Sequence, residues 1–210
     1  MIAELPKGPF RCIVADPPWD HSDGTGASYS SRGRRDCALP YPTMTVPEIC
    51  ALPVAKIVAR DALLFLWTTN RFLEDACAVC RAWGFDRVAT LVWCKQRGLG
   101  SGGVFYSNVE FILYCKRGSP ATPARLRSRW FDWPRSRHSA KPEAFQDMVE
   151  TVSPGPRLEL FARRARHGWV TLGNEADGLD MKDSLILLAQ GKHPCYGVEK
   201  HGESRHEQDV

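Results

Sequence analysis

The sequence predicts an α/β domain with a mostly parallel sheet and helices on both of its faces. Apolar runs of strand length alternate along the chain with segments of helix length, as in a parallel sheet with crossover helices. Several of these runs are apolar throughout, which is typical of strands buried on both faces. The chain has 210 residues, 43% of them hydrophobic, which is enough for one well-buried core.

The first strand is predicted in "RCIVADPPW" and ends at Asp16. An acid, two prolines and a tryptophan continue a strand poorly, but they end one rigidly. Residues 20–38 are rich in Gly, Ser and Arg, which predicts a long loop that is either a functional lid or disordered. Residues 45–59 predict a helix with Thr45 as its N-cap and Pro47 in its first turn.

The middle of the chain predicts further strands and one helix. Residues 62–69 form a fully apolar strand, and residues 71–85 predict an amphipathic helix closed by Gly84. Two more strands, 86–95 and 107–116, are joined by a glycine-rich connection.

The last third of the chain completes the alternation. Its predicted elements are a helix over 141–153 and strands over 157–165 and 168–175. One more helix is expected at 181–191, before a solvated tail. We therefore expect a single domain over residues 1–175 and a C-terminal extension, 176–210, that is partly helical or flexible.

Composition excludes several classes of protein. The net charge of +4 permits a nucleic-acid partner without requiring one. No apolar run approaches the roughly 18 residues of a membrane span, and the N-terminus has no signal-peptide core, so we expect a cytoplasmic protein. The eight cysteines are expected to be reduced core thiols, because no second pair follows Cys77 and Cys80 at zinc spacing.

Polar and aromatic residues follow several of the predicted strands. Asp16, Trp67, Arg163 and Asn174 each lie at or near the end of a different apolar run. Parallel sheets bind ligands at the carboxyl ends of their strands. We therefore expect these side chains to converge on one rim of the sheet.

Six short blocks along the chain resemble those of one known family. They are ADPPW, LPYPTM, LFLWTTN, HSAKPEAF, ELFARR and GWVTLGNE, in that order. In this order they resemble the MT-A seventy-kilodalton (MT-A70) family of S-adenosylmethionine-dependent adenine-N(6) methyltransferases, over residues 10–175. The resemblance implies a Rossmann-like class I methyltransferase sheet of seven mostly parallel strands with permuted motif order. The permuted order accounts for the absence of a G-x-G-x-x-G motif in the sequence.

The DPPW block carries the chemistry that this resemblance implies. The 6-amino nitrogen of adenine is a poor nucleophile because its lone pair is delocalised, so catalysis needs positioning more than a strong base. The Asp16 carboxylate and the Pro17 carbonyl are expected to accept the two amino hydrogens, while Pro18 helps to fix the turn. Trp19 is expected to stack on an extruded base. Taken alone, the stretch is equally compatible with a turn that buries Trp19 in the core.

The resemblance also assigns contacts for the S-adenosylmethionine cofactor. They are Asp16, Ser139, Lys141, Glu159, Phe161, Arg163, Asn174 and Glu175. Lys141 would bind the methionine carboxylate beside a helix N-terminus, although a solvated lysine is the alternative. Glu159, Phe161 and Arg163 alternate along a predicted strand, so we expect them on one face. Asn174 would hold the ribose with its neighbour.

Further residues are expected to contact the substrate. Tyr41 and Trp67 match walls of the family's adenine pocket, although either residue could instead be a turn or core aromatic. From 116 to 141, eight basic residues and one acid are interleaved with aromatics, which is typical of a surface for phosphates and unpaired bases. The members assigned to this surface are Arg127, Arg129, Trp133 and Arg135. A solvated loop is the alternative, and Arg164 and Arg166 are expected to be solvated or to face nucleic acid.

We therefore expect an S-adenosylmethionine-dependent methyltransferase of adenine in nucleic acid, with no metal. The length matches bacterial and phage members, which favours a site-specific DNA enzyme that is a monomer or homodimer. Two alternatives stay open: an RNA adenosine methyltransferase, and an inert paralogue that acts as a binding subunit. Inert members usually lose the DPPW block, and its presence here together with Lys141 and Asn174 disfavours that alternative.

Overall fold

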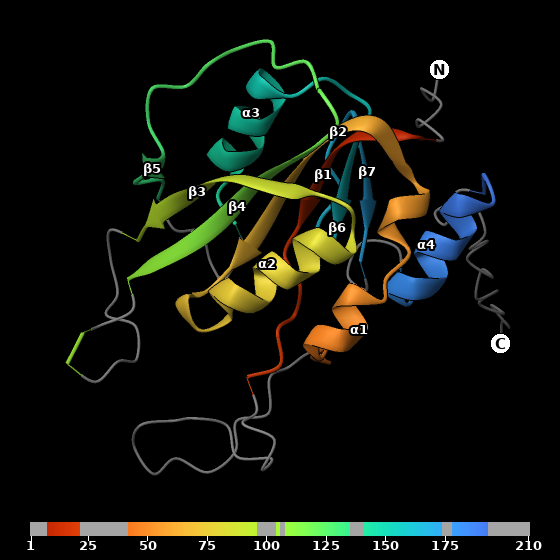
Figure 1. The fold of residues 1–210 in the computed structure, drawn as a ribbon, viewed down its shortest axis with the longest axis horizontal. Coiled ribbons are helices and arrows are strands. Elements are labelled where there is room, and N and C mark those ends of the chain that lie inside the picture. The colour runs from red at the N-terminus through yellow and green to blue at the C-terminus, as the bar shows by residue number, and fades with distance from the viewer. Residues whose placement is uncertain are drawn as a thin grey trace, which may run out of the picture.

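Seven strands form one sheet in the order β5-β3-β4-β2-β1-β6-β7 in the computed structural model (Figure 1). The structure describes residues 8–21, 42–95, 104–105, 108–134, 141–173 and 178–192. The strands are β1 (Phe10–Ala15), β2 (Val58–Thr68), β3 (Asp86–Cys94), β4 (Val109–Arg117), β5 (Trp130–Phe131), β6 (Arg157–Leu160) and β7 (Trp169–Leu172).

All strands except β4 run in the same direction. β1 pairs in parallel with β2 and β6, β6 with β7, and β3 with β5, whereas β4 is antiparallel to both β2 and β3. The predicted sheet of seven mostly parallel strands is confirmed. The reversal of β4 has a consequence for function, because it brings the first residues of β4 to the edge where the other strands end.

Helices cover both faces of the sheet, as predicted. They are α1 (Val46–Cys50), η1 (Val54–Lys56), η2 (Asn70–Phe72), α2 (Leu73–Ala82), α3 (Glu143–Val152) and α4 (Met181–Ala189). On one face Ile49 of α1, Val79 of α2 and Leu185 of α4 share a core. On the other face Phe145 and Val149 of α3 form a second core with the sheet (Figure 1). The sheet therefore separates two layers, with α3 alone on its side among the described helices.

The predicted helix over 45–59 is wrong in its second half. Thr45 is the N-cap as predicted, but α1 ends at Cys50 and β2 already begins at Val58. Pro53 lies between them, and a proline lacks the N–H that a continuing helix needs and disfavours helical conformation in the residue before it.

The core extends into the predicted C-terminal extension. α4 buries Met181, Leu185 and Leu188 in the same cluster as β6 and β7. Asp180 caps this helix, because its carboxylate accepts the Lys182 backbone N–H at 2.8 Å. The segment after β7 thus adds a packed layer rather than only a solvated tail.

The cysteines that the structure describes are free thiols. Cys12 and Cys115 are buried in β1 and β4, and the Cys115 sulfur lies 3.3 Å from that of Cys80 in α2. Within the described ranges, no cluster of His, Cys, Asp or Glu could hold a metal ion. The helices in these ranges are too short or too polar to cross a membrane.

Candidate active site

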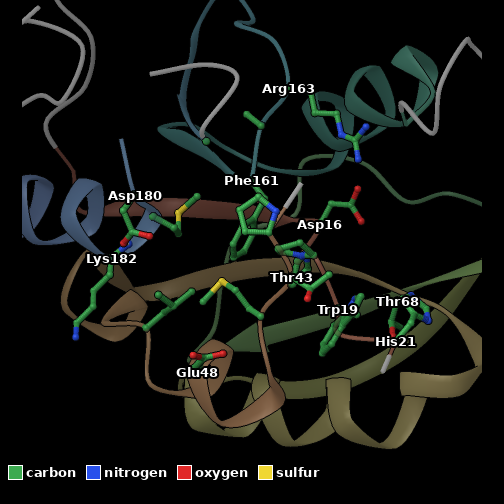
Figure 2. Close-up of a pocket in the computed structure, with 18 of the residues that line it drawn as sticks. Asp16, Trp19, His21, Thr43, Glu48, Thr68, Phe161, Arg163, Asp180 and Lys182 are labelled. Carbon is green, nitrogen blue, oxygen red and sulfur yellow. The ribbon is translucent and has the colours of Figure 1, made fainter. Parts of the chain in front are cut away.

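The end of the sheet where β1, β2 and β6 terminate is hollowed into a cavity of about 610 Å³ (Figure 2). Its wall includes Asp16 after β1, Thr69 after β2 and Arg163 after β6. Glu48 of α1 and Met181 of α4 line it as well. Pockets of this size are typical of small-molecule and cofactor sites. The predicted meeting of Asp16 and Arg163 at the carboxyl ends of the strands is confirmed.

Backbone hydrogen bonds hold the turn after β1. The Met44 N–H donates to the Pro18 carbonyl at 2.8 Å, and the Asp20 N–H donates to the Met44 carbonyl at 3.1 Å. The Trp19 N–H donates to the Pro17 carbonyl at 2.9 Å. A carbonyl oxygen has two lone pairs, so the Pro17 carbonyl can still accept one hydrogen bond from a ligand.

Trp19 is packed more tightly than a free stacking platform. Its ring stacks on Phe72, with centroids 5.3 Å apart and planes at 15°. Its Nε1 donates to the Trp67 carbonyl at 3.2 Å, and only 5% of the residue is exposed. Trp19 therefore anchors the turn after β1, whereas its contact with an extruded base stays a prediction.

Four charged side chains of alternating sign lie in a row that ends at Asp16. Lys141 Nζ lies 3.0 Å from Asp16 Oδ1 and 2.8 Å from Glu110 Oε2, and Lys95 pairs with the second oxygen of Glu110. We call Lys95, Glu110, Lys141 and Asp16 the charge row. The side chains of Lys141 and Glu110 are 18% and 16% exposed, so their interaction is partly shielded from water.

The charge row sets the protonation of its members. Burial raises the pKa of Asp16; Lys141 opposes this shift and Glu110 adds to it. Burial alone would lower the pKa of Lys141, but Asp16 and Glu110 outweigh it and raise that pKa. Burial alone would raise the pKa of Glu110, but Lys141 and Lys95 hold it below its usual value. Lys141 is therefore an ammonium and Glu110 a carboxylate, whereas Asp16 takes a proton more readily than an exposed aspartate does.

Lys141 lies directly before α3, as predicted, and reaches into the cavity. Its Nζ also lies 4.8 Å from the centroid of the Trp67 ring, a cation–π contact that further limits its freedom. The sequence placed Lys141 and Asp16 in separate family blocks, and the fold brings their charged groups into contact.

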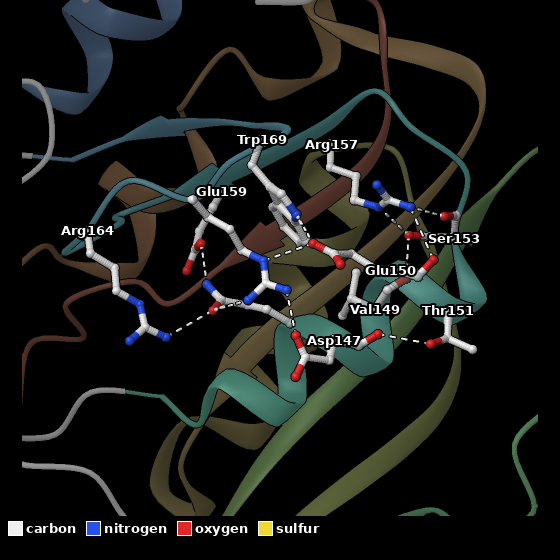
Figure 3. A network of polar contacts seen from close by, with 11 residues as sticks. Asp147, Val149, Glu150, Thr151, Ser153, Arg157, Glu159, Arg164 and Trp169 are labelled. Atoms are coloured by element: carbon white, nitrogen blue, oxygen red, sulfur yellow. Dashed lines mark hydrogen bonds and ion pairs between the residues drawn. The ribbon is translucent and has the colours of Figure 1, made fainter.

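The wall after β6 differs from the prediction. β6 ends at Leu160, and Phe161 has φ of 61°, a left-handed conformation that is rare for residues other than glycine. Because the chain turns there, the prediction that Glu159, Phe161 and Arg163 share one face is wrong. Phe161 packs against the core formed with α1, α2 and α4 and lines the cavity with Arg163, whereas Glu159 is directed to α3 (Figures 2 and 3).

Glu159 belongs to a polar network between β6 and α3 (Figure 3). Gln146 Nε2 donates to Glu159 Oε2 at 2.7 Å, and Arg164 donates to Gln146 Oε1 at 3.0 Å. Burial raises the pKa of Glu159 to about 7, the hydrogen bond from Gln146 opposes this, and the charge of Asp16 adds to it. Glu159 does not line the cavity, so its contact with a cofactor stays a prediction.

Arg164 and Arg166 fasten the segment after β6 to α3. Arg164 pairs with Glu143 at 2.6 Å, and Arg166 pairs with Asp147 at 2.6 Å and Glu150 at 2.8 Å. The expectation that these arginines are only solvated or face nucleic acid is therefore wrong. Their hydrogen bonds hold the segment after β6 against α3.

Replacing Glu159 with glutamine is expected to raise the melting temperature by about 2–4 °C at pH 8.5, with no gain at pH 4. The pKa of Glu159 rises from 4.5 to about 7 on folding, so its ionisation destabilises the fold as the pH rises through this interval. Glutamine cannot ionise and can still accept from Gln146. Thermal melting at both pH values checks this, and an equal gain at both would contradict it.

Trp67 does not form a wall of the cavity, and its prediction as a substrate contact is wrong. The residue is 1% exposed and packs in the second core against Trp93 and Phe145, with centroids 5.8 and 4.7 Å away. The core alternative holds because the strand end is covered by α3. Its neighbour Thr69 lines the cavity instead, and the Thr69 hydroxyl is buried with no partner among the described residues.

The described part of the predicted nucleic-acid segment that holds Arg127, Arg129 and Trp133 lies at the β5 edge of the sheet, and these three residues do not line the cavity. Arg127 and Arg129 are exposed, and the Arg129 carbonyl accepts the Val92 N–H at 2.8 Å. Trp133 is half-buried and stacks on Phe131 with centroids 4.2 Å apart. Trp133 thus packs against the second core. Nucleic-acid contact by Arg127 and Arg129 stays a prediction.

Several predicted site residues fall outside the residues that the structure describes. They are Tyr41, Arg135, Ser139, Asn174 and Glu175. Their roles stay predictions, as does the role of most of the loop 20–38. Glu110 and the Asp180 end of α4 also line the cavity, although neither was predicted from the sequence. An acid at the start of an apolar strand was the available signal for Glu110.

A model of the MT-A70 family matches residues 10–175, the same span as the sequence resemblance. The chain belongs to the MT-A70 family. The predicted family, its S-adenosylmethionine-dependent methyltransferase chemistry and its Rossmann-like fold are thereby confirmed. The permuted order explains why the DPPW block lies after the first MT-A70 strand and why Lys141 comes late in the chain.

Individual MT-A70 relatives differ in how much of their length the chain spans. It is 32% identical over 203 residues to the type II methyltransferase M.MunI of a Mycoplasma species, over 90% of this chain and 84% of that protein. It is 33% identical to an N(6)-adenosine-methyltransferase MT-A70-like protein of Drosophila melanogaster, over 89% of this chain and 30% of that protein. It is 31% identical to the human N(6)-adenosine-methyltransferase catalytic subunit METTL3, over 86% and 30%. The chain therefore spans less than a third of these two adenosine methyltransferases.

The site fits S-adenosylmethionine, the methyl donor of MT-A70 enzymes. The donor carries a carboxylate and an ammonium at its methionine end, which match the Lys141 ammonium and the Asp16 carboxylate. Phe161 offers an apolar surface in the same cavity of about 610 Å³, and Arg163 a further cation. The buried hydroxyl of Thr69 is an additional polar atom that a ligand could satisfy.

Proposed function

We propose that this chain methylates the 6-amino nitrogen of adenine in DNA, at specific sites. The observation that carries the proposal is the rigid Asp16–Pro17 turn in the cavity wall, with Lys141 3.0 Å from the Asp16 carboxylate. Incubation with labelled S-adenosylmethionine and a panel of DNA and RNA, single- and double-stranded, tests it. Label confined to RNA would favour the RNA alternative.

The turn supplies the two acceptors that the amino group needs. The Asp16 carboxylate accepts one amino hydrogen, and the free lone pair of the Pro17 carbonyl accepts the other. Two fixed acceptors draw the nitrogen away from planarity and localise its lone pair, which is the positioning that this reaction requires. Met44 and Trp19 hold the turn through their backbone N–H groups, so the acceptors are preorganised.

Bound S-adenosylmethionine supplies an electrophilic methyl group on a sulfonium centre. Lys141 would hold its carboxylate, and Phe161 and Arg163 would line its remaining surface. The methylated amino group must lose one proton, and Asp16 is placed to accept it at a carboxylate oxygen. The raised pKa of Asp16 suits that role, because a weaker acid is a better proton acceptor.

The similarity to a type II methyltransferase over most of both chains supports DNA as the substrate. The type II methyltransferase is matched over 84% of its length, whereas the adenosine methyltransferases are matched over 30% of theirs. We propose that this chain acts on DNA, as a monomer or homodimer in the cytoplasm. The inert-subunit alternative is disfavoured, because Asp16 and Lys141 form an intact pair in the cavity.

The exposed arginines beside β5 are proposed to bind the nucleic-acid backbone. Replacing both Arg127 and Arg129 with glutamate is expected to weaken DNA binding and to reduce the slope of log K against log salt by about 2. Each phosphate contact releases about one counterion when DNA binds, so the loss of two contacts removes the release of about two counterions. The same change at Arg60 and Arg81, which are exposed elsewhere, is the matched control. Equal slopes for both double variants would show that this edge does not contact DNA.

A further inference from the structure

The charge row contains an acid that the proposed reaction leaves without a role. Glu110 lies near the start of β4, the reversed strand, and lines the cavity. One of its oxygens pairs with Lys95, and the other lies 2.8 Å from Lys141 Nζ. Lys141 Nζ lies 3.0 Å from Asp16. Glu110 thus bridges two ammonium groups, and it shares one of them with the catalytic carboxylate.

The position of Lys141 is set by protein groups more than by solvent. The side chain is 18% exposed, and its Nζ lies 4.8 Å from the ring centroid of Trp67, which is itself 1% exposed. Charges interact more strongly in such a partly buried site than on an open surface. The Lys141 ammonium therefore lies between the carboxylates of Asp16 and Glu110, within ion-pair distance of both.

The two carboxylates compete for this ammonium. If Lys141 paired with Asp16 alone, the paired carboxylate would be a weaker acceptor for the N–H of a substrate. The other charged groups facing Asp16 act in opposite directions, since Arg163 lowers the pKa of Asp16 and the negative charge of Glu159 repels it. Glu110 is the second acid that pairs with Lys141. It therefore sets how strongly the Lys141 ammonium interacts with Asp16.

We propose that Glu110 is a positioning residue for methyl transfer, which holds the Lys141 ammonium between itself and Asp16 and so keeps the Asp16 carboxylate available to the amino group of adenine. This inference rests on the proposed function of Asp16. It leads to opposite expectations for two quantities. Without Glu110 the turnover number falls, but affinity for the cofactor carboxylate does not, because Lys141 loses a competitor.

Glu110→Gln tests the inference, because it removes the charge and keeps the shape. We expect kcat to fall about 10- to 100-fold, the range that misplacement of a catalytic group produces. Calorimetry with S-adenosylhomocysteine is expected to show unchanged or tighter binding. Glu74→Gln is the control, since Glu74 is exposed in the first turn of α2 and does not line the cavity. The control is expected to match the parent in both measurements.

The pH profile gives a second readout that a merely structural role would not move. A protonated Asp16 is a weaker hydrogen-bond acceptor and cannot take up the proton that the amino group releases, so its pKa sets the acid limb of kcat. The Glu110 charge raises that pKa, so Glu110→Gln is expected to move the limb to lower pH. Glu110→Asp keeps the charge and is expected to retain the limb of the parent.

Two results would overturn the inference while the parent still methylates adenine. One is an unchanged kcat and acid limb in Glu110→Gln. The other is a joint loss of kcat, S-adenosylhomocysteine affinity and melting temperature, which would make Glu110 a structural residue. A parent that transfers no methyl group to adenine would overturn the proposed function itself, and the inference with it.

Discussion

Replacing Asp16 with asparagine is expected to lower kcat for methyl transfer about 100- to 1000-fold, the range seen when one preorganised polar group is removed from an active site. Asparagine has nearly the same shape, but it lacks the charge that holds the amino hydrogen and accepts the released proton. Lys141 keeps Glu110 as a partner at 2.8 Å, so no ammonium is left unpaired and the fold should persist.

Single-turnover kinetics and thermal melting together check this expectation. Asp86→Asn is the matched control, because Asp86 is exposed at the opposite end of β3 from the cavity. We expect the control to retain the kcat of the parent. An Asp16→Asn variant with turnover within a few-fold of the parent would show that Asp16 is not the acceptor of the amino group.

Replacing Lys141 with methionine is expected to weaken binding of S-adenosylhomocysteine about 10- to 100-fold, since a hydrogen bond to a charged group contributes about 1.5–3 kcal/mol. The methionine chain keeps the packing on Trp67 but removes the ammonium that would hold the carboxylate of the ligand. It also leaves Asp16 and Glu110 facing each other without the shared cation, which raises the pKa of at least one of them.

Calorimetry across pH checks the Lys141 prediction. Lys116→Met is the control, because Lys116 is exposed on β4 away from the cavity. The affinity of Lys141→Met is expected to improve as the pH falls, when protonation relieves the repulsion between the two acids. Unchanged affinity at every pH would place the ligand carboxylate elsewhere.

Much of the fold and half of the charge row could be predicted from sequence. Apolar runs of strand length marked the central strands β1 and β2, because burial on both faces demands them. Asp16 was predicted from the way its strand ends, and Lys141 from a motif far along the chain. Their contact at 3.0 Å follows from the parallel sheet, which brings its strand ends to one edge.

The remaining features depend on tertiary structure that no local pattern encodes. Glu110 reaches the site only because β4 runs antiparallel to its neighbours. Phe161 leaves the face of Glu159 because the backbone turns at a positive φ, which strand periodicity does not anticipate. Trp67 was expected to face the ligand, but α3 covers it. The sequence does not show which face of the sheet a helix will cover, because that depends on the whole fold.

The most direct test of the account is the position of the transferred methyl group. Adenine-containing duplex DNA would be incubated with labelled S-adenosylmethionine and either the parent protein or Asp16→Asn, then digested to nucleosides and separated. We expect label in N6-methyladenine for the parent and at most about one hundredth of it for the variant. Label in another base, or equal label with Asp16→Asn, would contradict it.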